Sequence, residues 1–191
     1  ANTYAAGASM TITEDVVLEP VTITAPTTTV GADIKLAAAE ADLAMRFTAT
    51  LSKADYATLA ELGDVTLGML ITPAAYVAKA GSFTKEALDD IGATKGAYVD
   101  IAIDGYYDVT ATDYIFAGSL KGFSAATLAK NPDFAAILYA TVTTEGGDVF
   151  TVYGDYDFST IQDVKGVAES LATSSDLTDT QKGWLTTLVG K

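Results

Sequence analysis

The chain contains no cysteine and no histidine among its 191 residues. Their absence excludes disulfide bonds, thiol nucleophiles, histidine general bases and histidine-ligated metals. Zinc, copper and haem sites are therefore not expected, and we expect no cofactor. Serine catalysis lacks its usual base, and the chain has no Gly-x-Ser-x-Gly motif, nucleotide-binding loop or dinucleotide fingerprint. The sequence thus predicts a protein that is not an enzyme.

Positive charge is also scarce. The chain has 11 Lys and Arg against 25 Asp and Glu, which gives a net charge of −14. Such a field repels nucleic acid, and a single arginine cannot build a phosphate clamp, so no nucleic-acid partner is expected. That arginine, Arg46, would point away from its strand neighbours Met45 and Phe47. We expect it to pair with a carboxylate inside the fold.

Long apolar runs are missing, so no membrane span is expected. Hydrophobic residues nevertheless make up 49% of the chain and the mean hydropathy is +0.27, which is typical of a folded domain. Abundant Thr, Ala, Gly and Tyr with few charges indicate an exported protein, and a start at Ala1 fits a cleaved signal peptide. We expect a secreted protein, located outside a bacterium or on its surface.

Residues 1–30 differ from the remainder, and the sequence predicts an extended N-terminal arm there and one β-rich domain over residues 31–191. Gly7–Thr29 contains no Lys or Arg and is rich in β-branched residues, while Pro20 and Pro26 oppose a helix and closure of the arm onto its own domain. An ordinary first hairpin is the alternative. In strand addition to a neighbouring molecule, the apolar arm residues would enter the acceptor core. These residues are Met10, Ile12, Val17, Val21 and Ile23.

A short pattern occurs twice. Gly7–Ile12 and Gly31–Leu36 both read Gly-Ala-x-apolar-x-apolar. Two segments with the same alternation are able to occupy equivalent places in a sheet, one as the domain's own strand and one offered to a neighbour. A coincidence over six residues is the alternative.

The domain itself reads as strands with short helices between them. Alternation or β-branched residues predict strands at 45–51, 64–71, 97–103, 114–120, 134–144 and 148–153, with a hairpin turn at 145–147. Capping residues predict helices after Ser52, Pro73, Thr84, Ser159 and Thr178. We expect the helix after Ser159 to contain Gln162, and the last helix to bury Trp184, Leu185 and Leu188. The pattern predicts an α+β fold leaning to all-β, an antiparallel β-sandwich decorated with short helices.

Two groups of polar residues are candidate ligand sites. Tyr106 and Tyr107 lie in a predicted turn with Asp104 and Asp108, and such a patch suits a polysaccharide, since tyrosine rings pack on sugar faces. Ordinary cross-strand packing of tyrosines is the alternative. Asp155 and Asp157 are weak candidates for calcium, but no calcium-loop motif is present and solvated surface acids are the favoured interpretation.

Several segments of the domain resemble a family found in secreted, cell-wall-linked proteins of Clostridia and other Firmicutes. They are Gly31–Leu36, Met45–Tyr56, Gly68–Tyr76, Phe116–Leu120, Asp133–Ile137 and Thr178–Lys182. The resemblance covers about residues 31–191 and implies an extracellular surface location and no chemistry.

The sequence as a whole favours an exported structural subunit of a surface layer or extracellular filament. Its partner would be a further copy of the same chain, joined by N-terminal strand addition. The alternative is an extracellular carbohydrate-binding module that uses the surface tyrosines.

Overall fold

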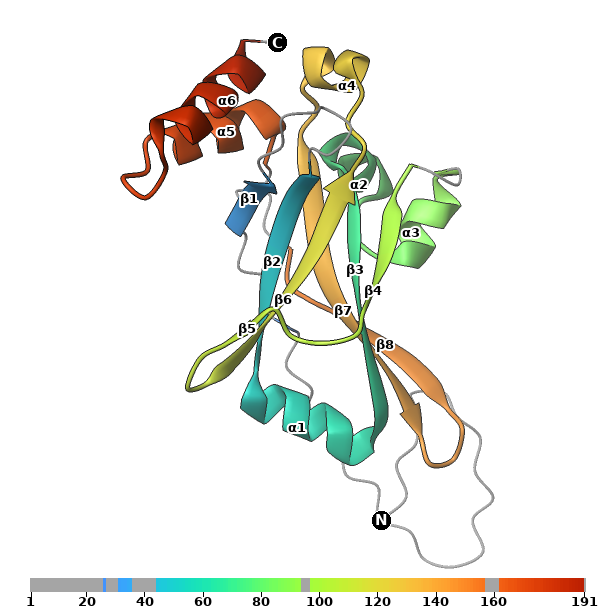
Figure 1. Cartoon of the computed structure of the whole chain (residues 1–191). Helices are drawn as coiled ribbons and strands as arrows, with labels where there is room; N and C mark the ends of the chain where they lie inside the picture. Colours follow the sequence, from blue (N-terminus) through green and yellow to red (C-terminus); the bar gives the residue numbers. More distant parts are fainter. Residues whose placement is uncertain (1–25, 27–30, 36–43, 94–96, 157–161, 191) are drawn as a thin grey trace, which may run out of the picture.

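The computed structural model describes residues 26, 31–35, 44–93, 97–156 and 162–190. Within them the chain forms two antiparallel sheets and six helices (Figure 1). The first sheet has the strand order β1 (Gly31–Lys35), β2 (Ala44–Ser52), β6 (Asp113–Lys121) and β5 (Asp108–Val109), and the second has the order β4 (Val99–Ile103), β3 (Gly63–Pro73), β7 (Phe134–Thr144) and β8 (Val149–Tyr153). The helices are α1 (Lys53–Leu62), α2 (Ala74–Ala80), α3 (Lys85–Asp90), α4 (Ala125–Lys130), α5 (Val164–Ala172) and α6 (Asp179–Val189). The predicted α+β, sandwich-like fold with short helices is confirmed.

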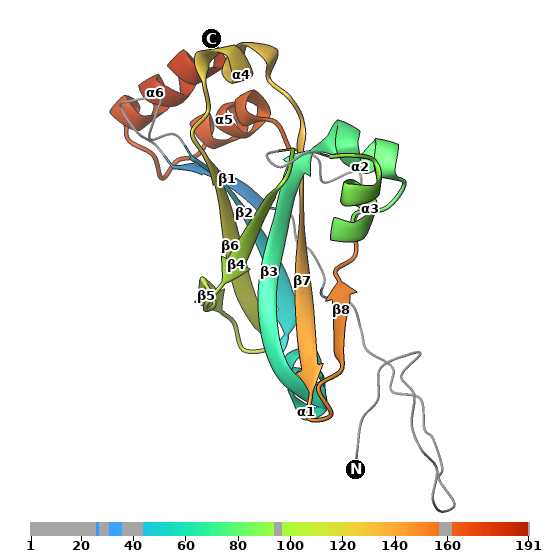
Figure 2. The ribbon, with the colours of Figure 1, turned by 90° about the vertical axis from the view of Figure 1, so that its right-hand side faces the viewer.

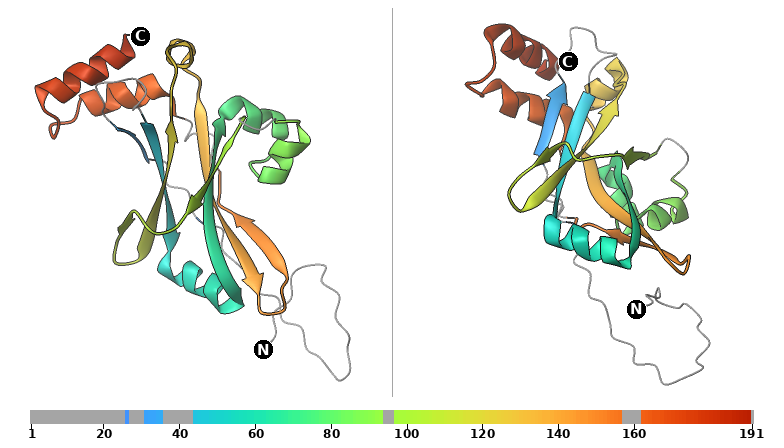
Figure 3. Two further views of the ribbon diagram at one scale, coloured as in Figure 1. Left: turned by 45° about the vertical axis from the view of Figure 1, so that its right-hand side comes forward. Right: turned by 60° about the horizontal axis from the view of Figure 1, so that its bottom comes forward.

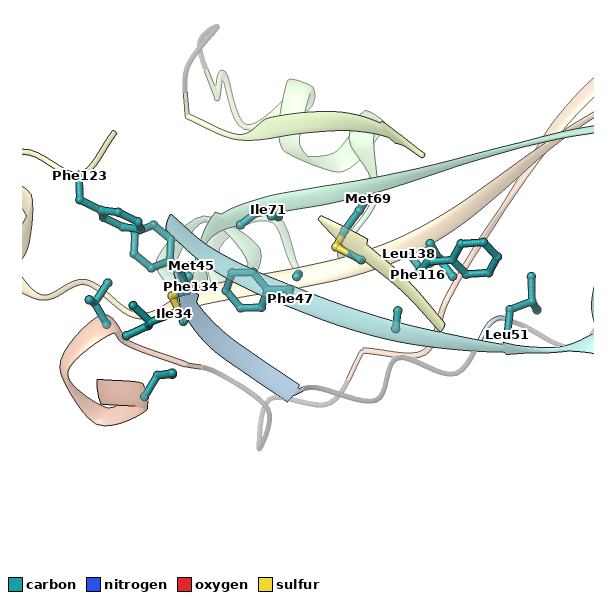
Figure 4. Close-up of a cluster of buried hydrophobic side chains, with 14 of the residues drawn as sticks. Ile34, Met45, Phe47, Leu51, Met69, Ile71, Phe116, Phe123, Phe134 and Leu138 are labelled. Carbon is teal, nitrogen blue, oxygen red and sulfur yellow. The ribbon is translucent and has the colours of Figure 1, made fainter. Parts of the chain in front are cut away.

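The main hydrophobic core lies between the two sheets. Because side chains alternate across a strand, β2 directs Met45 and Phe47 into it, and Met69 of β3 and Leu138 of β7 meet them from the other sheet (Figure 4). All four side chains are buried. A Cβ atom on Gly118 of β6 would lie 2.7 Å from the Met69 sulfur, so glycine at this position lets the two sheets approach closely.

A second, smaller core covers the outer face of the second sheet. Leu70 of β3 and Ile137 of β7 point outward and are buried beneath Val77 of α2 and Leu88 of α3 (Figure 2). These two central strands are therefore buried on both faces. That burial explains why they contain unbroken apolar runs instead of strict alternation.

Helix α1 joins the two sheets at one end of the sandwich (Figure 1). The Ser52 hydroxyl accepts a hydrogen bond from the backbone N–H of Asp55 at 2.9 Å, which is the predicted N-cap. The helix ends at Leu62, and at the next residue, Gly63, a Cβ atom would lie 2.1 Å from the carbonyl oxygen of Thr143 on β7. Glycine is needed here because the chain passes directly against the neighbouring strand.

Helices α5 and α6 lie beside β1 at the opposite end from α1 (Figure 3). The predicted start of α5 at Ser159 lies outside the described residues, but the prediction that Gln162 is helical is wrong. Gln162 exchanges two backbone hydrogen bonds with Phe134, of 2.8 and 3.0 Å, and this pairing with the end of β7 keeps it extended. The helix begins at Val164, after Asp163 caps the N–H of Gly166 at 2.8 Å.

The last helix has the predicted capping box of Thr178 and Gln181, and it buries Leu185 and Leu188 as predicted. The predicted burial of Trp184 is wrong, since this residue is 43% exposed. Helix α6 packs against α5, and Trp184, directly before the buried Leu185, stays partly in contact with solvent.

Candidate functional site

Strand β4 leaves the second sheet before β3 ends, and a hollow forms where it leaves. The last residue of β4, Ile103, pairs with Leu67, so a continued strand would place Gly105 opposite Val65. The chain instead crosses to β5 in the first sheet (Figure 1). Within the described residues, Gly63–Thr66 therefore has no strand partner on this side. The hollow beside it has a volume of about 410 Å³.

Aromatic rings form much of the wall of this hollow. Tyr114 of β6 is central, since Tyr106 stacks on it with ring centroids 5.5 Å apart and Tyr56 of α1 meets it edge-on at 5.5 Å. Phe116 continues the wall toward the buried core. Tyr106 itself is 58% exposed. The hollow is thus lined largely by apolar and aromatic side chains together with polar groups such as Asp104, which suits amphipathic or apolar groups.

The predicted ligand patch is divided between two places. Tyr106 and Asp104 line the hollow, whereas Tyr107 and Asp108 do not. Tyr107 donates its backbone N–H to Ile115 at 2.7 Å, and its ring lies beneath the Arg46 guanidinium, whose carbon is 4.4 Å from the ring centroid. The two neighbouring tyrosines, in the bend between β4 and β5, therefore serve different surfaces.

Arg46 has a carboxylate partner, but the pair is not inside the fold. It forms an ion pair with Asp33, which lies directly opposite on β1. The side chains are 31% and 46% exposed, because both point away from the core on the outer face of the first sheet. Together with Tyr107, the pair fastens the edge strand β1 to the segment that follows β4.

The calcium candidates gain no support from the described part of the chain. Asp157 lies outside it, and the described residues hold no group of three acidic side chains arranged for a metal.

The backbone N–H of Asp155 donates to the carbonyl oxygen of Pro26 at 3.1 Å, and Pro26 is buried. The chain therefore contacts its own domain at Pro26. Proline has no backbone N–H, but its carbonyl oxygen accepts this hydrogen bond. The arm residues Met10, Ile12, Val17, Val21 and Ile23 all lie outside the described residues.

A network of tyrosines and carboxylates on the outer face of the second sheet was not predicted. Tyr139 donates to Asp100 at 2.6 Å, and Lys85 at the start of α3 reaches the second oxygen of that carboxylate at 2.5 Å. Tyr153 donates to Glu86 at 3.0 Å, and Tyr98 donates to Asp89 at 2.7 Å. The network fastens α3 onto the sheet.

These hydrogen bonds keep the phenols protonated. The bond to Asp89 raises the pKa of Tyr98 to about 12. Burial, with the bond to Glu86, raises the pKa of Tyr153 to about 12, and burial with the bond to Asp100 raises the pKa of Tyr139 further. An ionised phenolate beside a carboxylate would be repelled by it, so these groups are suited to hold the structure and not to act as bases.

Strand β1 shows what the repeated Gly-Ala-x-apolar-x-apolar pattern does in the domain. It is an edge strand, paired only with β2 among the described strands. Ile34 enters the core and is 5% exposed, Ala32 packs against the same core, and Asp33 between them faces outward. The pattern therefore attaches a short strand to a sheet edge by its second and fourth residues.

Comparison of the chain with family models, curated proteins and solved structures finds no match. The resemblance to a family of secreted proteins therefore stays a prediction. Among the described residues, every helix is too short or too polar to cross a membrane.

Proposed function

We propose that the protein is an exported, non-enzymatic structural subunit of a surface layer or extracellular filament, which assembles by N-terminal strand addition. The observation that carries this proposal is the attachment of β1. A segment of pattern Gly-Ala-x-apolar-x-apolar pairs with a sheet edge and buries Ile34, and the arm carries the same pattern at Gly7–Ile12. Strand addition uses this arrangement, in which backbone bonds supply affinity and alternate side chains supply specificity.

The distribution of charge supports assembly through the arm. Two copies with a net charge of −14 repel one another, so contacts between them require neutral surfaces. Residues 1–13 contain no charged side chain. This first part of the arm, which includes Gly7–Ile12, is thus able to meet a second copy without adding to the repulsion.

Electron microscopy and sedimentation of the full chain test the proposal, with a copy lacking residues 1–24 as the comparison. This deletion spares Pro26 and its contact with Asp155. We expect regular filaments or sheets from the full chain and monomers from the shortened chain. Monomers from both chains, at all concentrations and salt levels, would refute the proposal.

One observation favours a second candidate, an extracellular carbohydrate-binding module. Tyr106 stacks on Tyr114 at the mouth of a hollow that also contains Asp104, and exposed tyrosine rings with a nearby carboxylate suit a sugar face and its hydroxyls. Affinity electrophoresis against cell-wall and plant polysaccharides tests it. The candidate predicts retardation that is lost in Tyr106→Ala and kept in Tyr107→Ala, since Tyr107 faces Arg46 and not the hollow.

A further inference from the structure

We infer that the hollow beside β3 is the acceptor site for Gly7–Ile12 of a second copy, with Met10 entering the hollow. The inference rests on the proposed function and adds the location and the chemistry of the contact. It identifies the partner as an uncharged, extended segment with alternating apolar side chains.

The acceptor has a free backbone edge and a missing side chain. Gly63–Thr66 of β3 has no strand partner on the β4 side within the described residues, and Val65 of that segment is only half-buried. Continued in register, β4 would place Gly105 opposite Val65, but the chain has left the sheet at that point. Gly105 instead lines the hollow, where a Cβ atom on it would meet nothing within 4 Å. A strand added in line with β4 would pair with the edge of Gly63–Thr66 and direct a side chain into this space.

The donor segment matches the strand that already occupies another edge of the fold. In β1, the fourth residue of the pattern, Ile34, is the one buried in the core. The corresponding residue of Gly7–Ile12 is Met10, and methionine is suited to fill an irregular apolar space. At about 3.3 Å per residue the six-residue segment extends over about 20 Å, which is more than the free edge requires.

A second copy is favoured over the chain's own arm by where the arm joins the domain. Pro26 is held by Asp155, which follows β8 at one edge of the second sheet, while the acceptor lies beside β4 at the other edge. The inner face of this sheet is packed against the first sheet, and its outer face carries α2 and α3. A returning arm would have to pass around the end of the sandwich, whereas an arm that extends outward reaches a neighbour directly.

Cysteine pairing in the full chain tests the contact, since the protein has no cysteine of its own. Two variants, Met10→Cys and Gly105→Cys, are assembled as a mixture and oxidised. We expect a disulfide-linked dimer on a non-reducing gel that neither variant forms alone. The matched control replaces Met10→Cys by Thr11→Cys, whose side chain would face the opposite side of the added strand, and should give little dimer.

The outcomes separate this inference from the proposed function. Filaments without the mixed dimer would overturn the acceptor site and leave strand addition standing. A disulfide within one chain of the Met10→Cys and Gly105→Cys double variant, without the mixed dimer, would show that the arm closes on its own domain. If the full chain forms no filaments and the two variants form no mixed dimer, both proposals are refuted together.

A blocking substitution provides an independent readout. Gly105→Phe should fill the hollow and abolish filaments without lowering the melting temperature, because its Cβ atom enters open space. Gly183→Phe on α6 is the matched control, since its Cβ also meets nothing within 4 Å, and it should assemble normally. Normal filaments from Gly105→Phe, with loss of polysaccharide binding instead, would assign the hollow to a sugar and overturn the inference.

Discussion

Gly63, at the junction of α1 and β3, offers a sharp test of how the two sheets are joined. A Cβ atom at this position would lie 2.1 Å from the carbonyl oxygen of Thr143, and 2.7 and 2.8 Å from two further backbone atoms of β7. These contacts are far shorter than van der Waals separation, and they involve backbone atoms of a paired strand that cannot rotate away. Gly63→Ala therefore forces β3 and β7 apart at the point where α1 enters the second sheet.

The expected cost follows from the nature of the clash. Overpacking a closely packed region typically costs about 1–3 kcal/mol, and a clash with backbone belongs at the upper end, about 3 kcal/mol. For a chain of this size, that cost lowers the melting temperature by about 6–12 °C. Calorimetry and urea unfolding measure it, with Gly105→Ala as the control, expected to stay within about 0.5 kcal/mol of the parent. Equal unfolding free energies for the two variants would refute the steric argument.

Three further predictions concern the tyrosine network, a helix cap and assembly. Because the folded-state pKa values of Tyr98 and Tyr153 are about 12 against an ordinary value of 10, the unfolded chain loses these protons first. The stabilisation that these two tyrosines contribute is complete below about pH 10 and is lost as the pH rises toward about 12. The free energy of unfolding in urea should therefore fall more steeply across this range for the parent than for the variant with both Tyr98→Phe and Tyr153→Phe. Ser52→Ala removes the cap of α1 and should cost about 1 kcal/mol in urea unfolding, whereas an unchanged midpoint would contradict the cap. Raising the salt from about 0.01 to about 0.15 M shortens the screening length from about 30 to about 8 Å, so filaments should form at a lower protein concentration. If sedimentation shows that filaments need a higher protein concentration at the higher salt, charge repulsion between copies is not what limits assembly.

Much of the secondary structure could be predicted because its signals lie within a few residues. Ser52 and Asp55 identify the start of α1, and the β-branched run at Phe134–Thr144 coincides with β7. The prediction for Gln162 was wrong because a distant partner, Phe134, provides backbone hydrogen bonds that compete with the helix. Local capping preferences are weak compared with such tertiary pairing.

The candidate site was predicted only in part. The sequence indicated a patch at Tyr106 and Tyr107, but the division of the two between the hollow and Arg46 depends on how the segment after β4 crosses between the sheets. The bonds from Tyr139 to Asp100 and from Tyr153 to Glu86 join residues 39 and 67 positions apart. No local pattern contains such pairs.

The sequence by itself determined the chemistry that is open to this protein and the class of its fold. Without histidine and cysteine it lacks imidazole and thiol groups, its acidity disfavours polyanionic partners, and the alternation in strands such as β2 favours sheets that bury one face. Only the tertiary structure decided where the fold is incomplete. The hollow exists because β4 departs after Ile103 while β3 extends to Gly63, so that one strand edge and one apolar space have no partner among the residues that the structure describes. Such a mismatch in strand length arises from pairing between distant segments, and a sequence read locally does not contain it.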